Sequence, residues 1–173
     1  MRKGCCFTGH RKIPENDLPN LQKRLQKAVK GLLKQGVTTF YTGGALGFDT
    51  LAAQAVLNAR RFHPQVKLIL ALPCHNQAER WKEGDRLLYE SVKQRADEVV
   101  YVSEHYTRGC MFERNRYMVD HSDFCVCYCT NGEGGTAYTV KYAQRKGIPV
   151  INLSGEKRPV VAGKVSISKF AVR

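Results

Sequence analysis

Short apolar runs alternate with longer amphipathic stretches along this chain, and this alternation limits the folds that it can adopt. Six runs of five to seven residues are rich in β-branched and other apolar side chains, which is typical of β-strands. These runs span residues 4–8, 38–42, 66–72, 98–102, 123–129 and 148–153. Several are apolar at nearly every position, as expected for strands that helices cover on both faces.

The stretches between these runs have the periodicity of helices that bury one face. In the clearest case, Pro19 lies near the start of the apolar stripe and Gly36 follows its end. Helices are expected at 18–35, 48–61, 83–96, 111–121 and 136–146. Strands and helices in strict alternation imply right-handed crossovers. We therefore predict an α/β, three-layer, Rossmann-like fold with a mainly parallel sheet of six or seven strands.

The 173 residues fit one domain, with no change of composition that would indicate a linker. We expect a core at 3–153 and a basic C-terminal extension at 154–173, read as a closing strand plus a tail. The first ten residues lack the apolar run of a secretory signal, and no apolar stretch approaches the eighteen residues that a membrane span needs. The expected location is the cytoplasm, without a membrane partner.

Seven cysteines are present, an odd number outside a secretory context, so a disulfide framework is not expected. Cys125, Cys127 and Cys129 alternate within an apolar run, so on a strand they share one face as small core residues. The spacing of zinc ligands is absent. The prediction is buried, inert thiols, no metal site and no cofactor.

The formal net charge is +13, and it is unevenly distributed. Residues 1–61 hold eleven Lys and Arg against three Asp and Glu. Much of this excess lies on the first expected helix, at Lys23, Arg24, Lys27, Lys30 and Lys34. Such a face is either solvated or attracts nucleic acid or a phosphorylated small molecule.

Three loops follow strands at what should be one edge of the sheet, and two are rich in glycine. They read TGHRK (8–12), TGGALGFD (42–49) and TNGEGGT (130–136). In open parallel sheets, ligands bind beyond the carboxyl ends of the strands. Glycine lets a ligand approach backbone N–H groups, and a following helix N-terminus adds unpaired N–H groups and partial positive charge. These loops favour an anion, most naturally a phosphate, although each could also be a simple turn.

Polar side chains near these loops supply candidates for chemistry. In the expected helix 111–121, Asn115 falls on the apolar face and should be hydrogen-bonded, while Arg114 on the flank can reach a phosphate or pair with an acid. Asp49 near a helix start should stay ionised, and it either grips a hydroxyl or caps the helix. His10 is an acid/base group or a hydrogen-bonded turn residue, and Glu133 is a loop carboxylate.

Four segments together resemble the YpsA-like branch of the SLOG superfamily, which also contains the Smf/DprA DNA-processing proteins and the LOG phosphoribohydrolases. The segments are CCFTGHRKIP, GGALGFDTLAA, RNRYMVDHSD and GGTAYTVKYAQRKGIPVINL, in the expected order over about residues 3–153. The resemblance implies a Rossmann-like fold with a site for a nucleotide or nucleotide derivative. By motif, it implies ligand-binding roles for Gly9, His10, Arg11, Gly43, Gly44, Gly47, Asp49, Arg114, Asn115, Gly134, Gly135 and Thr136.

The resemblance also shows a departure. LOG enzymes carry a PGGxGTxxE motif with a catalytic glutamate, whereas here GGT is followed by Ala137, Tyr138, Thr139 and Val140, none of them acidic. Asp49, His10 and Glu133 remain as substitutes for the missing carboxylate. The sequence therefore leaves the question of an enzyme open.

Three functions follow, in order of preference. The first is a sensor or regulator that binds a nucleotide or an ADP-ribose-like derivative without turnover. The second is hydrolysis of the N-glycosidic bond of a nucleotide-derived substrate. The third is single-stranded DNA binding in the Smf/DprA manner, with nucleic acid as the less favoured partner. A homodimer is compatible with paired helices in such folds.

Overall fold

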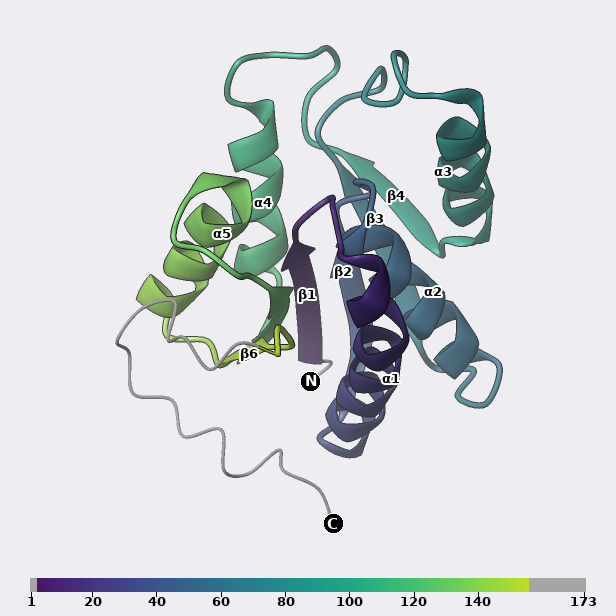
Figure 1. Ribbon diagram of the computed structural model, residues 1–173, viewed down its shortest axis with the longest axis vertical. Coiled ribbons are helices and arrows are strands. Elements are labelled where there is room, and N and C mark those ends of the chain that lie inside the picture. Colours follow the sequence, from purple (N-terminus) through teal and green to yellow (C-terminus); the bar gives the residue numbers. More distant parts are fainter. Residues whose placement is uncertain (1–2, 156–173) are drawn as a thin grey trace.

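The computed structural model describes residues 3–155, which form one parallel β-sheet with helices on both faces (Figure 1). The strands are β1 (Lys3–Gly9), β2 (Val37–Thr42), β3 (Lys67–Leu72), β4 (Glu98–Tyr101), β5 (Phe124–Tyr128) and β6 (Val150–Asn152). All pairings are parallel, in the order β4-β3-β2-β1-β5-β6. The predicted three-layer, Rossmann-like architecture is confirmed.

The helices also lie where the periodicity predicted them. They are α1 (Leu18–Lys34), α2 (Phe48–Arg60), α3 (Glu83–Arg95), α4 (Cys110–Asp120) and α5 (Gly134–Arg145), with a 3₁₀ turn at Glu15–Asp17 before α1. The expected closing strand and tail fall, beyond Gly155, outside the described residues. None of the helices within residues 3–155 has the length and apolar content needed to cross a bilayer.

The two faces of the sheet bury different side chains. Helices α1, α2 and α3 cover one face, where Phe7 and Phe40 of the strands meet Phe48 of α2. Helices α4 and α5 cover the other face, where Cys6 and Cys125 pack against them. All seven cysteines are free and buried, as predicted. Cys125 and Cys127 occupy alternate positions of β5, so their side chains point to one face of the sheet.

The order of the strands reverses direction at β1, and this reversal positions the site. From β1 the chain builds outward through β2, β3 and β4, and then crosses back to add β5 on the other side of β1. Gly9 at the end of β1 lies in register with Tyr128 at the end of β5. The loops after β1 and β5 therefore leave the sheet side by side, at the kind of switch point where doubly wound sheets bind ligands.

Candidate functional site

A cavity of about 330 Å³ opens at the carboxyl edge of the sheet, beside this switch point. Its lining comes from the end of β1, the loops after β1 and β2, the first turn of α2, helix α4 and the start of α5. The lining residues are Phe7, Thr8, Gly9, His10, Arg11, Ala45, Asp49, Met111, Arg114, Asn115, Met118, Gly135 and Thr136. The volume lies in the range of small-molecule sites and suits a ligand the size of a mononucleotide.

The cavity brings together most of the residues that the sequence singled out. Eight of them line it: Gly9, His10, Arg11, Asp49, Arg114, Asn115, Gly135 and Thr136. Five others lie outside the lining: Gly43, Gly44, Gly47, Glu133 and Gly134. The loops after β1 and β2 and the start of α5, which follows β5, therefore converge on one space.

The glycines of the first two loops serve packing more than ligand access. A Cβ on Gly9 would lie 2.3 Å from the Phe48 ring, and one on Gly43 would lie 2.3 Å from Nη1 of Arg114. A Cβ on Gly47, which has a φ of 76°, would lie 2.1 Å from the backbone oxygen of Arg11. Glycine is needed at these positions because neighbouring elements fill the space where a side chain would lie. The sequence had instead predicted backbone left bare for a ligand.

The start of α5 has the opposite character. No atom lies within 4 Å of a Cβ built on Gly134 or Gly135, so this turn is open. The helix has no side-chain cap and no acidic residue in its first turn, and Gly135 and Thr136 face the cavity. The first N–H groups of a helix have no partner within the helix, and they carry its partial positive charge. This end of the cavity is suited to an anion.

Arg114 ties α4 to the loops at the floor of the site, and it is 6% exposed. Its Nη1 donates to the carbonyl oxygens of Gly43 and, at 3.5 Å, of Ala71. Its Nε donates to Oδ1 of Asn115 at 2.7 Å. Among the described residues, Nη2 has only the sulfur of Met111 as a partner, at 3.9 Å, which is a weak contact. Burial lowers the pKa of Arg114, and the nearby Asp49 counteracts this. Within residues 3–155 no ion pair shorter than 4.0 Å joins Arg114 to an acid, but Asp49 lies close enough to affect its pKa.

Asn115 is buried on α4 and lines the cavity, as its place on the apolar face suggested. Its oxygen accepts from Arg114, and its amide nitrogen makes no hydrogen bond within residues 3–155. Met111 and Met118, which were not among the predicted site residues, lie beside Asn115 on the same helix and give the cavity an apolar wall. Their positions could have been predicted, because Met111 and Met118 lie four residues before and three residues after Asn115 and residues so spaced share a helix face.

Asp49, in the first turn of α2, is a buried carboxylate on the cavity wall. Its Oδ2 accepts from the amide of Ala45 at 3.2 Å, and the N-cap position belongs to Gly47. Burial raises the pKa of Asp49 from 3.8 to about 6, against the opposing effects of Arg114, the Ala45 amide and Arg11. The carboxylate is thus ionised at neutral pH, as expected, but it titrates in mildly acidic solution.

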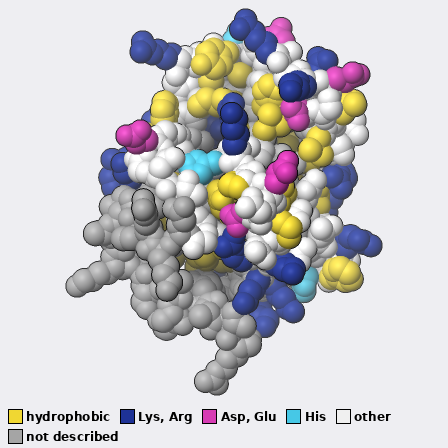
Figure 2. Space-filling view, viewed as in Figure 1, with side chains coloured by type: hydrophobic (Ala, Val, Ile, Leu, Met, Phe, Trp, Pro, Cys, Tyr) yellow, Lys and Arg dark blue, Asp and Glu magenta, His cyan; other side chains and the backbone are white. Residues whose placement is uncertain are grey.

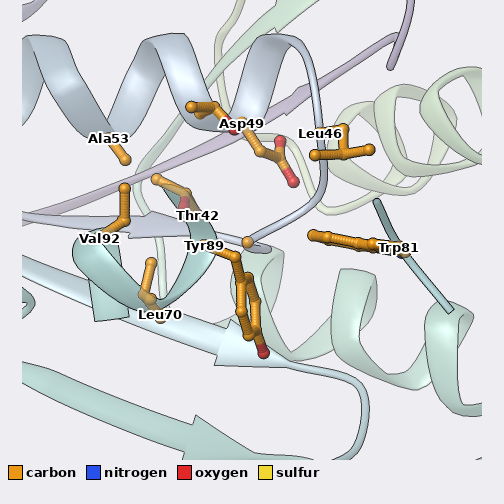
Figure 3. Close-up of a pocket in the computed structure, with 10 residues that line it drawn as sticks. Thr42, Leu46, Asp49, Ala53, Leu70, Trp81, Tyr89 and Val92 are labelled. Carbon is orange, nitrogen blue, oxygen red and sulfur yellow. The ribbon is translucent and has the colours of Figure 1, made fainter. Parts of the chain in front are cut away.

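A second, much smaller chamber lies on the other side of Asp49. Its volume is about 10 Å³, close to the minimum that one water molecule requires. Figure 3 shows Asp49 and Thr42 facing this space, with Leu46, Tyr89 and Trp81 around it. The Thr42 hydroxyl is fully buried and has no partner within the described residues. Trp81 packs on Tyr89 here and is not a wall of the main cavity.

His10 is held as a hydrogen-bonded turn residue. The backbone amide of Thr130, after β5, donates to Nε2 of His10 at 2.9 Å, so the ring proton resides on Nδ1. The His10 amide also donates to the carbonyl of Tyr128, and its carbonyl accepts from the amide of Phe48. Burial lowers the pKa of His10. One histidine thereby links the loops after β1 and β5 to the start of α2.

Glu133, the remaining acid/base candidate, lies outside the cavity lining. Glu133 is exposed at the N-cap of α5, where its amide donates to Oδ1 of Asn131. Thr139, within the segment that stands in place of the LOG glutamate, is buried, and its hydroxyl donates to the carbonyl of Gly135 at 2.8 Å. Of the three candidates, Asp49 is the carboxylate that the cavity contains.

Two curated relatives from Bacillus are similar to most of the chain. The SPbeta prophage-derived protein YoqJ of Bacillus subtilis (strain 168) is 30% identical over 138 residues, covering 72% of this chain and 81% of YoqJ. A UPF0398 protein of Bacillus pumilus (strain SAFR-032) is 29% identical over 136 residues, covering 77% of this chain and 73% of the relative.

Solved structures share the fold at low sequence identity. DNA processing protein A from Helicobacter pylori superposes with a TM-score of 0.60 at 19% identity, covering 86% of this chain and 63% of that chain. The Streptococcus pneumoniae protein has the same TM-score at 15% identity and is covered over 49% of its length. The chain therefore spans less than two thirds of either protein. TM1055 has a TM-score of 0.56 at 20% identity.

A family model gives the assignment. The model described as the YspA SLOG family matches residues 6–149, which include every loop that lines the cavity. The match agrees with the motifs at the ends of β1, β2 and β5 and with the parallel sheet that carries them. The chain belongs to the YpsA family of the SLOG superfamily.

Proposed function

We propose that the cavity binds a nucleotide or nucleotide derivative and that the protein acts as a sensor or regulator that holds this ligand without turning it over. The observation that carries the proposal is the uncapped start of α5, which faces a cavity that also contains Arg114 and Asp49. An anion site and a hydroxyl acceptor then lie in one space of mononucleotide size.

The phosphate belongs at the α5 end of the cavity. The free N–H groups of Gly135 and Thr136 favour an anion there, as helix N-termini do. The exposed Arg11 and the spare Nη2 of Arg114 add charge-assisted hydrogen bonds. The ionised Asp49 repels a phosphate, which keeps the ligand's charged group away from the α2 side.

The sugar and base belong on the remaining walls. Asp49 accepts hydrogen bonds from ribose hydroxyls, since a carboxylate is an acceptor only. The unused amide nitrogen of Asn115 and the Nδ1–H of His10 donate to ring or sugar atoms. Met111 and Met118 form the apolar surface on which a planar base packs.

Titration calorimetry tests the proposal with a pair of matched variants. Gly135→Asp places a carboxylate at the start of α5, where it suits the helix but repels a phosphate, and nothing within 4 Å hinders it. Gly132→Asp adds the same charge in an open loop position outside the cavity lining. A nucleoside monophosphate and ADP-ribose should bind to the natural protein and to Gly132→Asp, but not to Gly135→Asp. Equal loss in both variants, or no binding to the natural protein at millimolar ligand, would contradict it.

Hydrolysis of an N-glycosidic bond is the second candidate, and Asp49 is the observation in its favour. A buried carboxylate whose pKa is raised to about 6 is suited to proton transfer near neutral pH. Chromatography of nucleoside monophosphates after incubation should then reveal free base, which disappears with Asp49→Asn. Intact nucleotide after prolonged incubation with binding-competent protein would leave the sensor as the function.

Single-stranded DNA binding is the third candidate. DNA processing protein A of Helicobacter pylori, which shares this fold, is described as having a single-stranded DNA binding mode. A cavity for one nucleotide can also take a nucleotide within a strand. In that case a short oligonucleotide competes with the nucleoside monophosphate, and Gly135→Asp abolishes the binding of both.

A further inference from the structure

Helix α1 carries a row of lysines on its outer face. Lys23, Lys27, Lys30 and Lys34 are spaced by four, three and four residues, so they fall on one narrow strip of the helix. All four are exposed, while the opposite face of α1 is buried in the core. With a rise of 1.5 Å per residue, the strip is about 16 Å long. We call Lys23, Lys27, Lys30 and Lys34 the lysine row.

The lysine row has no counter-charges. Helix α1 contains no acidic residue, and none of the four lysines forms an ion pair within residues 3–155. Between residues 18 and 67 there are eight Lys and Arg but a single acid, Asp49, which is buried. By contrast, α3 has three basic and three acidic residues, and α4 has two of each. Arg24 and Arg60 pair with Asp17 and Asp97, outside this stretch, whereas the four lysines have no such partner within residues 3–155. Among the described residues, α1 therefore carries an uncompensated positive face.

The end of α2 extends this basic surface and adds an aromatic ring. Figure 2 shows Lys and Arg side chains grouped at the lower right, over the C-terminal ends of α1 and α2, with hydrophobic atoms beside them. Phe62, just beyond α2, is 78% exposed, and the Arg61 guanidinium lies 5.9 Å from the centre of its ring. An exposed aromatic ring beside a guanidinium offers a surface on which an unpaired base can stack.

We propose that the lysine row binds the phosphate backbone of a single-stranded nucleic acid, with an unpaired base stacked on Phe62. A line of unpaired lysines matches a chain of regularly spaced phosphates, and counterion release favours such binding. An anionic membrane fits less well, because the apolar face of α1 is buried in the core and cannot insert into lipid. A duplex fits less well, because its bases are already stacked and leave the Phe62 ring without a partner.

This surface is separate from the cavity and does not depend on the proposed nucleotide site. The cavity opens at the carboxyl ends of the strands, whereas α1 and α2 end near the opposite edge (Figure 1). No residue of the lysine row lines the cavity.

Fluorescence anisotropy with a labelled oligothymidine at several salt concentrations tests the proposal. For single strands the slope of log K against log salt is about −0.7 per phosphate contact, so four lysines give about −2.8. Lys27→Gln/Lys30→Gln should reduce this slope by about 1.4 and weaken binding about tenfold at low salt. Arg80→Gln/Lys82→Gln removes two exposed charges elsewhere and should preserve both the slope and the affinity.

Two further variants test the role of Phe62 and the independence of this surface from the cavity. Phe62→Ala should weaken strand binding without changing the salt slope, because it removes stacking and no charge. Gly135→Asp should leave oligothymidine binding intact. Undetectable binding of oligothymidine at low salt, or an equal loss of affinity in the two double variants, would overturn the proposal. So would a duplex that binds as tightly as the single strand, or loss of oligothymidine binding in Gly135→Asp. Urea unfolding of each variant confirms that it is folded.

Discussion

Asp49→Asn should make this protein more stable at neutral pH. Asp49 is almost completely buried, so its charge is little screened by solvent. Raising a carboxyl pKa from 3.8 to about 6 corresponds to about 3 kcal/mol of folding free energy at pH 8. The asparagine keeps a carbonyl oxygen for the Ala45 amide and carries no charge, so most of this cost is removed.

The sign follows from where each state binds the proton. The unfolded chain releases the Asp49 proton near pH 3.8, while the folded protein retains it until about pH 6. The stability associated with Asp49 is therefore fully present below pH 3.8 and is lost as the pH rises through 6. The effect of Arg114 is already included in this pKa, since the guanidinium is one of the groups that lower it.

Urea unfolding of the natural protein and of Asp49→Asn between pH 4 and pH 8 measures the difference. The two proteins should be of similar stability at pH 4, and the variant should be more stable by up to about 3 kcal/mol at pH 8. Comparing the two at each pH cancels the contributions of other titrating groups. A variant that is less stable at pH 8, or a difference that does not change with pH, would refute this account of the buried carboxylate.

Two further predictions concern the loops around the cavity. Gly43→Ala places a Cβ 2.3 Å from Nη1 of Arg114 and 2.9 Å from Oδ2 of Asp49, so the guanidinium must move. We expect the free energy of unfolding, measured with urea, to fall by about 1–3 kcal/mol. Nucleotide binding should also become weaker. Gly31→Ala, with nothing within 4 Å of its Cβ, is the control and should be neutral or stabilising, and a destabilisation equal to that of Gly43→Ala would contradict the steric explanation. Burial lowers the pKa of His10, so the unfolded chain takes up the His10 proton at a higher pH than the folded protein does. The contribution of His10 to the stability of the fold should therefore be lost as the pH falls below 6.5. The stability difference between the natural protein and His10→Gln, followed from pH 7.5 to 5.5, should shrink, and a constant difference would contradict the neutral ring.

The fold could be predicted from the sequence because its signals are local and repeated. The stripe of Leu21, Leu25, Val29 and Leu32 determines α1, and the alternation at Cys125 and Cys127 determines the faces of β5. The position of α4 was also predicted correctly, although one of its large apolar side chains, Phe112, is 41% exposed and contacts the ring of Tyr138.

The details of the cavity could not be predicted, because they depend on contacts between distant segments. Gly9, Gly43 and Gly47 resemble a ligand cradle in the sequence, but Phe48 and Arg114 and the backbone of the neighbouring loop occupy the space beside them. The amide of Thr130 that fixes the tautomer of His10 lies 120 residues away. No local pattern reports such pairs.

A crystal structure of the protein with a bound nucleoside monophosphate tests the central claim most directly. The loops after β1 and β2, helix α4 and the start of α5 line one cavity, and the start of α5 is its proposed anion site. The phosphate should lie within hydrogen-bonding distance of the Gly135 and Thr136 amides and of Arg11 or Arg114, with the sugar beside Asp49. A phosphate bound at any other part of the molecule, with the cavity free of ligand at saturation, would contradict the claim.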